Sequence, residues 1–251
     1  MTRCFPLFLL ALWSWSLLAA PPSFPLKVSE NRRHLVDSTG KPFFVMGDTP
    51  WFIQRTNPMH PVILGETGYE DEPNNIELLP DAKKGDLWTP YRIRRNAWWA
   101  VTSGAAGYCA GTRLWRWEPN WRETMQVRST KEAPHLLRLW QEIAWRKLVP
   151  DAKHELVTAG FGGWKQVDYA TAALADDGRC AVVYLPTPPP FMIDFTRLNG
   201  PVTGRWFDPT RGDFQPVEGS PFANTGRREF TSPARNAAGQ SDWVLLLEVT
   251  R

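Results

Sequence analysis

Two short apolar segments of this chain are each followed by a loop that carries a carboxylate. Segment 42–46 (PFFVM) leads to Asp48, and segment 61–64 (PVIL) leads to Glu66. A buried parallel strand delivers the residues behind it to one edge of its sheet, where a carboxylate can act as nucleophile, general acid or general base. Glu66 is therefore the candidate catalytic residue, with a solvated loop carboxylate as the alternative. Asp48 either contacts a substrate hydroxyl or caps the turn that follows it.

Other side chains near these loops could hold a ligand. Tyr69 and Glu70 lie in the Glu66 loop, where Tyr69 could hydrogen-bond the nucleophile and Glu70 could bind a sugar hydroxyl or a basic side chain. A purely structural role is the alternative for each of them. The chain also has 14 Trp among 251 residues. The flat Trp ring packs against the apolar face of a sugar as readily as against other side chains. Trp51, Trp115 and Trp117 are therefore candidates for a sugar subsite, with core packing as the alternative.

Strands and helices alternate along the first part of the chain. Apolar spacing predicts a helix over residues 91–103, followed by a strand and its loop over 108–117. Ser129 and Glu132 have the spacing of a capping box, which predicts the start of a second helix there. Pro150 is expected to end that helix.

From about residue 167 the pattern changes to short strands separated by Gly and Pro turns. The clearest predicted strands are 181–185, 202–207 and 243–249. Such a succession predicts a small antiparallel β-sandwich. The expected fold is thus α/β plus all-β, with one domain over residues 26–160 and a sandwich over residues 165–251.

Residues 1–20 have the pattern of a signal peptide. Arg3 precedes an apolar run over residues 5–18, which is too short to span a membrane comfortably. We therefore expect a secreted or periplasmic protein without a membrane anchor after cleavage, with a retained anchor as the alternative. The formal charge is +3 and the charges are interspersed, so no nucleic-acid partner is expected.

Cysteine and histidine spacing indicates no metal site. Cys4 lies in the predicted signal, which leaves Cys109 and Cys180 as either one disulfide or, as we expect, two free buried thiols. The four His residues have no ligand spacing. Neither a metal nor another cofactor is expected.

Several motifs, in this order, resemble the apiosidase-like glycoside hydrolases of the family 140 type. They are 26–31 (LKVSEN), 40–44 (GKPFF), 47–51 (GDTPW), 61–70 (PVILGETGYE) and 103–108 (SGAAGY). In the second half, 206–209 (WFDP) and 241–245 (SDWVL) resemble the family known as a "putative collagen-binding domain of a collagenase". The resemblance covers nearly all of the chain after the predicted signal.

The resemblance implies a (β/α)₈ TIM barrel that removes a terminal sugar, such as apiose, from plant polysaccharide. Such a barrel takes about 250 residues, whereas only residues 26–160 are available here. The strand ending near Trp51 is followed within about a dozen residues by the strand before Glu66. The intervening strands have no counterpart, so a partial barrel is expected.

By the same resemblance, Glu66 matches the family's strand-end glutamate and would be the nucleophile. Glycoside hydrolysis normally uses two carboxyl groups, about 5–5.5 Å apart in retaining enzymes and about 6.5–9.5 Å apart in inverting ones. The family takes its acid/base residue from a middle strand, which this chain lacks. The expected function is thus that of an exported glycoside hydrolase-like protein acting on plant-type polysaccharide or oligosaccharide.

The missing strands leave one question and two alternative functions. The internal deletion leaves open whether the protein is an active enzyme. The first alternative is a non-catalytic carbohydrate- or matrix-binding module, and the second is a complete small enzyme of another fold that reuses these motifs.

Overall fold

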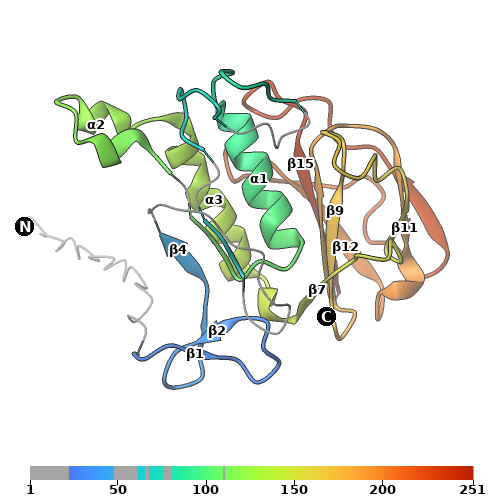
Figure 1. The fold of residues 1–251 in the computed structure, drawn as a ribbon. Helices are drawn as coiled ribbons and strands as arrows, with labels where there is room; N and C mark the ends of the chain where they lie inside the picture. Colours follow the sequence, from blue (N-terminus) through green and yellow to red (C-terminus); the bar gives the residue numbers. More distant parts are fainter. Residues whose placement is uncertain (1–22, 48–61, 66–67, 76–80, 110, 251) are drawn as a thin grey trace, which may run out of the picture.

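The protein combines a few helices with several sheets (Figure 1). The computed structural model describes residues 23–47, 62–65, 68–75, 81–109 and 111–250. The helices are α1 (Pro90–Thr102), α2 (Trp121–Thr124) and α3 (Arg128–Glu142), with 3₁₀ turns η1 (Arg113–Arg116), η2 (Trp145–Lys147) and η3 (Phe195–Arg197). None of the helices within these residues has the length and apolar character needed to cross a membrane.

The first part of the chain forms two small sheets. An antiparallel sheet contains β1 (Lys27–Val28), β2 (Leu35–Val36) and β3 (Pro42–Phe43), in that order. A parallel sheet has the order β4-β6-β5 and contains β4 (Val45–Gly47), β5 (Ile63–Leu64) and β6 (Gly107–Cys109). The predicted strand over 42–46 is therefore two strands that belong to different sheets.

The parallel sheet contains one βαβ unit, β5-α1-β6. Gly107 allows β4 to approach closely, because a Cβ at this position would fall 2.4 Å from the carbonyl oxygen of Val45. Helix α1 confirms the predicted helix over 91–103. The Thr89 side chain accepts a hydrogen bond from the backbone N–H of Arg92, and Pro90 occupies the first turn, where its missing N–H costs nothing. Gly104 follows the end of the helix and has a positive φ of 97°, a conformation that glycine adopts readily.

Helix α3 begins and ends differently from the prediction. Its N-cap is Val127, and the side chain of Ser129 makes no capping hydrogen bond. Glu132 does not form the predicted capping box, because its carboxylate binds the guanidinium groups of Arg94 and Arg128 instead. The helix ends at Glu142, so Pro150 lies in strand β7 rather than at the helix end.

Two antiparallel sheets make up the second part of the chain. The six-stranded sheet has the order β13-β12-β15-β10-β9-β7, and the three-stranded sheet has the order β14-β11-β8. The strands are β7 (Leu148–Pro150), β8 (Val157–Ala159), β9 (Thr171–Ala175), β10 (Cys180–Leu185), β11 (Phe191–Asp194), β12 (Val202–Phe207), β13 (Phe214–Pro216), β14 (Arg227–Phe230) and β15 (Trp243–Val249). Strands β7 and β8 pair within these sheets, which therefore begin ahead of the predicted start at residue 165.

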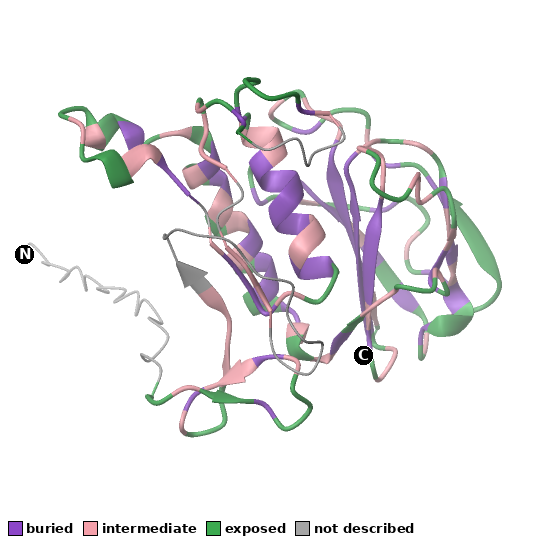
Figure 2. Cartoon of the chain, viewed as in Figure 1, coloured by how far each residue is buried: buried purple, intermediate pink, exposed green. Residues whose placement is uncertain are grey.

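The six-stranded sheet is buried on both faces, as Figure 2 shows for its central strands. In β10, Val182 and Tyr184 join a core with α1 and α3, whereas Val183 and Leu185 join a second core with the three-stranded sheet. Helices α1 and α3 thus lie between the parallel sheet and the six-stranded sheet (Figure 1).

A buried charge cluster joins these layers. The guanidinium of Arg94 on α1 binds both carboxylate oxygens of Asp242 at 2.8 Å, and it also binds Glu132 on α3. The hydroxyl of Tyr184 donates a hydrogen bond of 3.3 Å to the same Asp242 carboxylate. The side chains of Arg94, Glu132 and Asp242 are each at most 4% exposed. Segments from both halves of the chain therefore share one buried ionic contact.

Candidate functional site

The strands that precede the predicted carboxylates end at the same edge of the parallel sheet. Val45 in β4 and Ile63 in β5 both pair in register with Gly107 in β6. Residues that follow these three strands therefore start from one edge, as barrel enzymes require. Asp48, Trp51 and Glu66 themselves lie outside the described residues, so their roles stay predictions.

The loop behind β5 is held against Trp88. A Cβ at Gly68 would fall 2.2 Å from the Trp88 indole, so only glycine allows this close approach. The next residue, Tyr69, forms a parallel bridge to Gly111 behind β6. This brings the Tyr69 ring to 6.4 Å from the ring of Trp115, measured between centroids. The structure thus brings together two of the residues predicted to contact substrate.

The Glu70 carboxylate has hydrogen-bond partners within the chain. Its two carboxylate oxygens accept hydrogen bonds from the backbone N–H groups of Arg128, at 3.3 Å, and Ser129, at 2.7 Å. These donors belong to the first turn of α3, whose N–H groups have no partner within the helix. Glu70 therefore caps α3 from a distant loop, which is the structural alternative for this residue, and its role in substrate binding stays a prediction.

Trp115 and Trp117 lie at the surface rather than in the core. Their exposed fractions are 57% and 74%, which excludes the alternative of core packing. Trp117 lies in the left-handed region at φ 48°, where it ends η1, and its ring contacts Trp121 edge-on at 6.4 Å. We call Tyr69, Trp115, Trp117 and Trp121 the tryptophan surface. It includes the first residue of α2, which projects from the body of the molecule in Figure 1.

Charged side chains surround the tryptophan surface. The Arg116 guanidinium lies 5.0 Å from the Trp115 ring, and that of Arg122 lies 4.2 Å from the Trp121 ring. Such cation–π contacts restrict the orientation of an exposed ring. Arg116 also binds Glu72 at 3.0 Å and Glu118 at 3.9 Å. Neither of these glutamates is therefore an unpartnered carboxylate.

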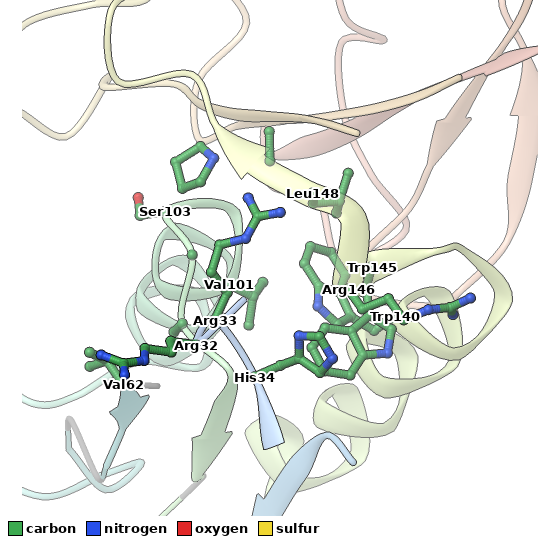
Figure 3. Close-up of a pocket in the computed structure, with 14 residues that line it drawn as sticks. Arg32, Arg33, His34, Val62, Val101, Ser103, Trp140, Trp145, Arg146 and Leu148 are labelled. Carbon is green, nitrogen blue, oxygen red and sulfur yellow. The ribbon is translucent and has the colours of Figure 1, made fainter. Parts of the chain in front are cut away.

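A separate cavity of about 340 Å³ lies at the opposite edge of the parallel sheet (Figure 3). It is lined by residues just ahead of β5 and β6, such as Val62 and Ala105, together with Arg33, His34 and Trp145. Burial and the charges of Arg146 and Arg33 lower the pKa of His34, whose ring contacts Trp145 edge-on at 5.4 Å. Of the predicted site residues that the structure describes, none lines this cavity.

The walls of this cavity come from segments far apart in the chain, so the sequence does not predict it. No pattern in any one of them indicates a pocket. Across the described residues, no group of three or more His, Cys, Asp or Glu side chains could hold a metal ion.

Two family models match the chain. Residues 52–147 match the apiosidase-like catalytic domain, and residues 149–248 match the "putative collagen-binding domain of a collagenase". The first match includes Glu66, Tyr69, Trp115 and Trp117. No match was found among curated proteins.

Solved structures with a similar fold are glycoside hydrolases. One, described only as a glycoside hydrolase, is 24% identical with a TM-score of 0.65, and the match covers 78% of this chain and 44% of that one. A glycoside hydrolase family 5 protein from Bacteroides vulgatus is 21% identical with a TM-score of 0.63, covering 78% and 43%. The chain thus spans less than half the length of either structure. By these matches, residues 52–147 are similar to part of the apiosidase-like catalytic domain, and residues 149–248 are similar to the collagen-binding domain named above.

Proposed function

We propose that this protein binds carbohydrate on the tryptophan surface, at the edge of the parallel sheet where glycoside hydrolases hold their substrates. The observation that carries the proposal is the exposure of Trp115 and Trp117 beside the ends of β5 and β6. Exposed indole rings offer a flat apolar face to the C–H groups of a sugar, with polar partners at the rim. The expected ligand is a plant-type polysaccharide or oligosaccharide.

The first part of the chain is, in this proposal, a fragment of a (β/α)₈ barrel. The single βαβ unit, with β4 added beside β6, supports this interpretation. The antiparallel sheets then form the companion β-sandwich. The predicted signal over residues 1–20 would export the protein to the periplasm or the medium.

Binding without hydrolysis is favoured by the carboxylates that the structure describes around this edge. Glu70 caps α3, and Glu72 and Glu118 bind arginines. A glycosidase needs a second carboxyl group placed about 5–10 Å from the first. Each of these three described carboxylates is therefore engaged by another group of the chain.

Glycoside hydrolysis is the second candidate function, because the catalytic-domain match includes Glu66. Release of reducing sugar from plant cell-wall polysaccharides by the purified protein would support it. Loss of that release in Glu66→Gln, with binding retained, would assign the nucleophile. A preparation that binds the polysaccharide but releases no sugar supports binding alone.

The binding proposal predicts that Trp115→Ala/Trp117→Ala weakens retention on insoluble plant polysaccharide at least about tenfold, since each lost stacking contact is worth ~1 kcal/mol. Depletion of the protein from solution by washed cell-wall material measures this. Phe24→Ala is the matched control, because Phe24 is 70% exposed and lies outside the tryptophan surface. Unchanged retention of the double variant would contradict the proposal.

A further inference from the structure

Another cavity, lined by aromatic rings, lies where the antiparallel sheets meet the end of α1. Its volume is about 510 Å³, which is in the range of small-molecule sites. Its walls come from the end of α1 at Ser103, from the loop after β7 at His154, and from the loop before β9 that carries Trp164 and Tyr169. Helix α1 begins near the tryptophan surface and ends at this cavity. Its 13 residues span about 20 Å, so the two places are distinct.

Four aromatic rings form a corner in this cavity. His154 stacks on Phe161 with 3.7 Å between ring centroids and 9° between planes. The Tyr169 ring stands nearly perpendicular to both His154, at 88°, and Trp164, at 83°. The Tyr169 hydroxyl lies 3.2 Å from Nε2 of His154. Trp164 is 71% exposed, so one large ring borders the cavity with most of its surface open to solvent.

The two loops that carry these rings are fixed by their own hydrogen bonds. The Asp151 carboxylate accepts hydrogen bonds from the backbone N–H groups of residues 155, 156 and 157. In the second loop, the Asp168 carboxylate accepts from the N–H of Gly163 at 3.2 Å, and a Cβ at Gly162 would clash with the Asp168 carbonyl at 2.5 Å. The indole N–H of Trp99 on α1 donates to the Tyr169 carbonyl at 2.7 Å.

Two of the loop residues adopt a backbone conformation that side chains rarely take. His154 has φ 54° and Lys165, next to Trp164, has φ 65°. Such strain persists only where the surrounding structure enforces it, and it is concentrated at functional sites. Here the two positions are His154 itself and the residue that follows Trp164.

We propose that this cavity is a binding site for neutral carbohydrate, with a sugar ring stacked on Trp164. The hydroxyls of Ser103 and Tyr169 are the expected partners of the sugar hydroxyl groups. No Lys or Arg is among its lining residues, so a phosphate-bearing ligand would find no cationic partner there. This site goes beyond the proposed function, because it lies at the other end of α1 and uses different residues.

Proline-rich peptides also bind to aromatic surfaces and are the alternative ligand for this cavity. Such peptides lie in aromatic-lined grooves as an extended polyproline helix. The perpendicular rings at Tyr169 close a corner instead of lining an open groove, which favours a compact ring over an extended chain. A peptide ligand is therefore an outcome that the experiment must detect.

The test uses isothermal titration calorimetry of the full chain with neutral hexasaccharides of β-1,4-glucan, β-1,4-xylan and β-1,4-galactan. We expect binding of at least one of them. In the Trp115→Ala/Trp117→Ala background, where the tryptophan surface does not contribute, we expect Trp164→Ala to weaken this binding at least about tenfold and Trp164→Phe to restore part of it. Because Trp164 is mostly exposed, an unchanged thermal unfolding temperature in Trp164→Ala verifies folding. Phe24→Ala is the matched control and should leave the affinity unchanged.

The same titrations in the Trp115→Ala/Trp117→Ala background separate the two sites. Binding that survives there and is removed by adding Trp164→Ala supports the second site. Binding that is lost in this background, and unaffected by Trp164→Ala alone, overturns the second site and leaves the proposed function intact. Absence of binding to all three sugars, or binding of a (Pro-Pro-Gly)₁₀ peptide that depends on Trp164, would also overturn the second site.

Discussion

At the scale of single residues, Glu70 shows how a carboxylate near a predicted active site can have a structural role. It follows Tyr69 in a loop that the family match includes, and its type suits sugar binding. In the folded protein its oxygens instead accept from the first turn of α3, 58 and 59 positions further along the chain. A carboxylate at a helix N-terminus is also favoured by the helix dipole.

We predict that Glu70→Ala lowers the free energy of unfolding by about 1 kcal/mol, as the loss of a helix cap typically does. Urea titration monitored by circular dichroism measures this. Glu70→Gln keeps one acceptor oxygen and should lose less, and Glu123→Ala on α2 serves as a surface control. A Glu70→Ala variant with unchanged stability and weaker carbohydrate binding would instead support the role predicted from sequence.

At the scale of elements, α1 carries a buried cation that anchors the loop in front of it. The Arg95 guanidinium binds the Asp81 carboxylate at 2.7 and 3.0 Å, and its side chain is fully buried. The same guanidinium lies 4.7 Å from the Trp99 ring. Burial alone would raise the pKa of Asp81, but the hydrogen bond and charge of Arg95, with Arg92, outweigh it and lower the pKa.

This ion pair gives a pH prediction. Because the pKa of Asp81 is lower in the folded state than its usual value of 3.8, ionised Asp81 stabilises the fold above about pH 4. That contribution is lost as the pH falls through the folded-state pKa. Asp81→Asn should therefore lower the urea midpoint at pH 7 and have a smaller effect at pH 3. An equal effect at both values would show that Asp81 does not titrate as expected.

At the scale of the whole molecule, the two family-matched parts share one interior. The Trp98 ring on α1 stacks on Tyr184 of β10 at 6.0 Å and meets Trp140 of α3 edge-on at 5.8 Å. The Arg94 cluster lies in the same layer, with Asp242 immediately before β15. The helices of the first part therefore cover a face of the six-stranded sheet that would otherwise expose apolar side chains.

We predict that the two parts unfold together in one transition and that Arg94→Ala destabilises the whole protein by about 3–5 kcal/mol, because it leaves the buried Asp242 carboxylate without its cationic partner. Differential scanning calorimetry and urea titration measure both effects. Arg92→Ala is the control on the same helix and should cost less, since the Arg92 side chain is 15% exposed against 4% for Arg94 and its partner Asp81 keeps Arg95. Two separate transitions in the unmodified protein would contradict this account of the interface.

Local patterns were enough to predict several elements. Helix α1 and strands β12 and β15 follow from apolar spacing and from their bounding Pro, Gly and Asp residues, because neighbours in sequence set the periodicity of an element. The family motifs likewise predicted the two kinds of domain that the comparisons match. The run 181–185 was predicted only as a strand, and the structure shows that β10 is buried on both faces, as its apolar residue at every position allows.

Other features were decided only by the tertiary structure. Ser129 and Glu132 had the right spacing for a capping box, but the Glu132 carboxylate binds the buried guanidinium of Arg94 instead. The cap of α3 comes from the Glu70 carboxylate. The exposure of Trp115 and the aromatic corner at Trp164 also depend on segments distant in the chain. Spacing fixes which side chains share a face, whereas the partner of a charge or ring is set by which distant segments fold beside it.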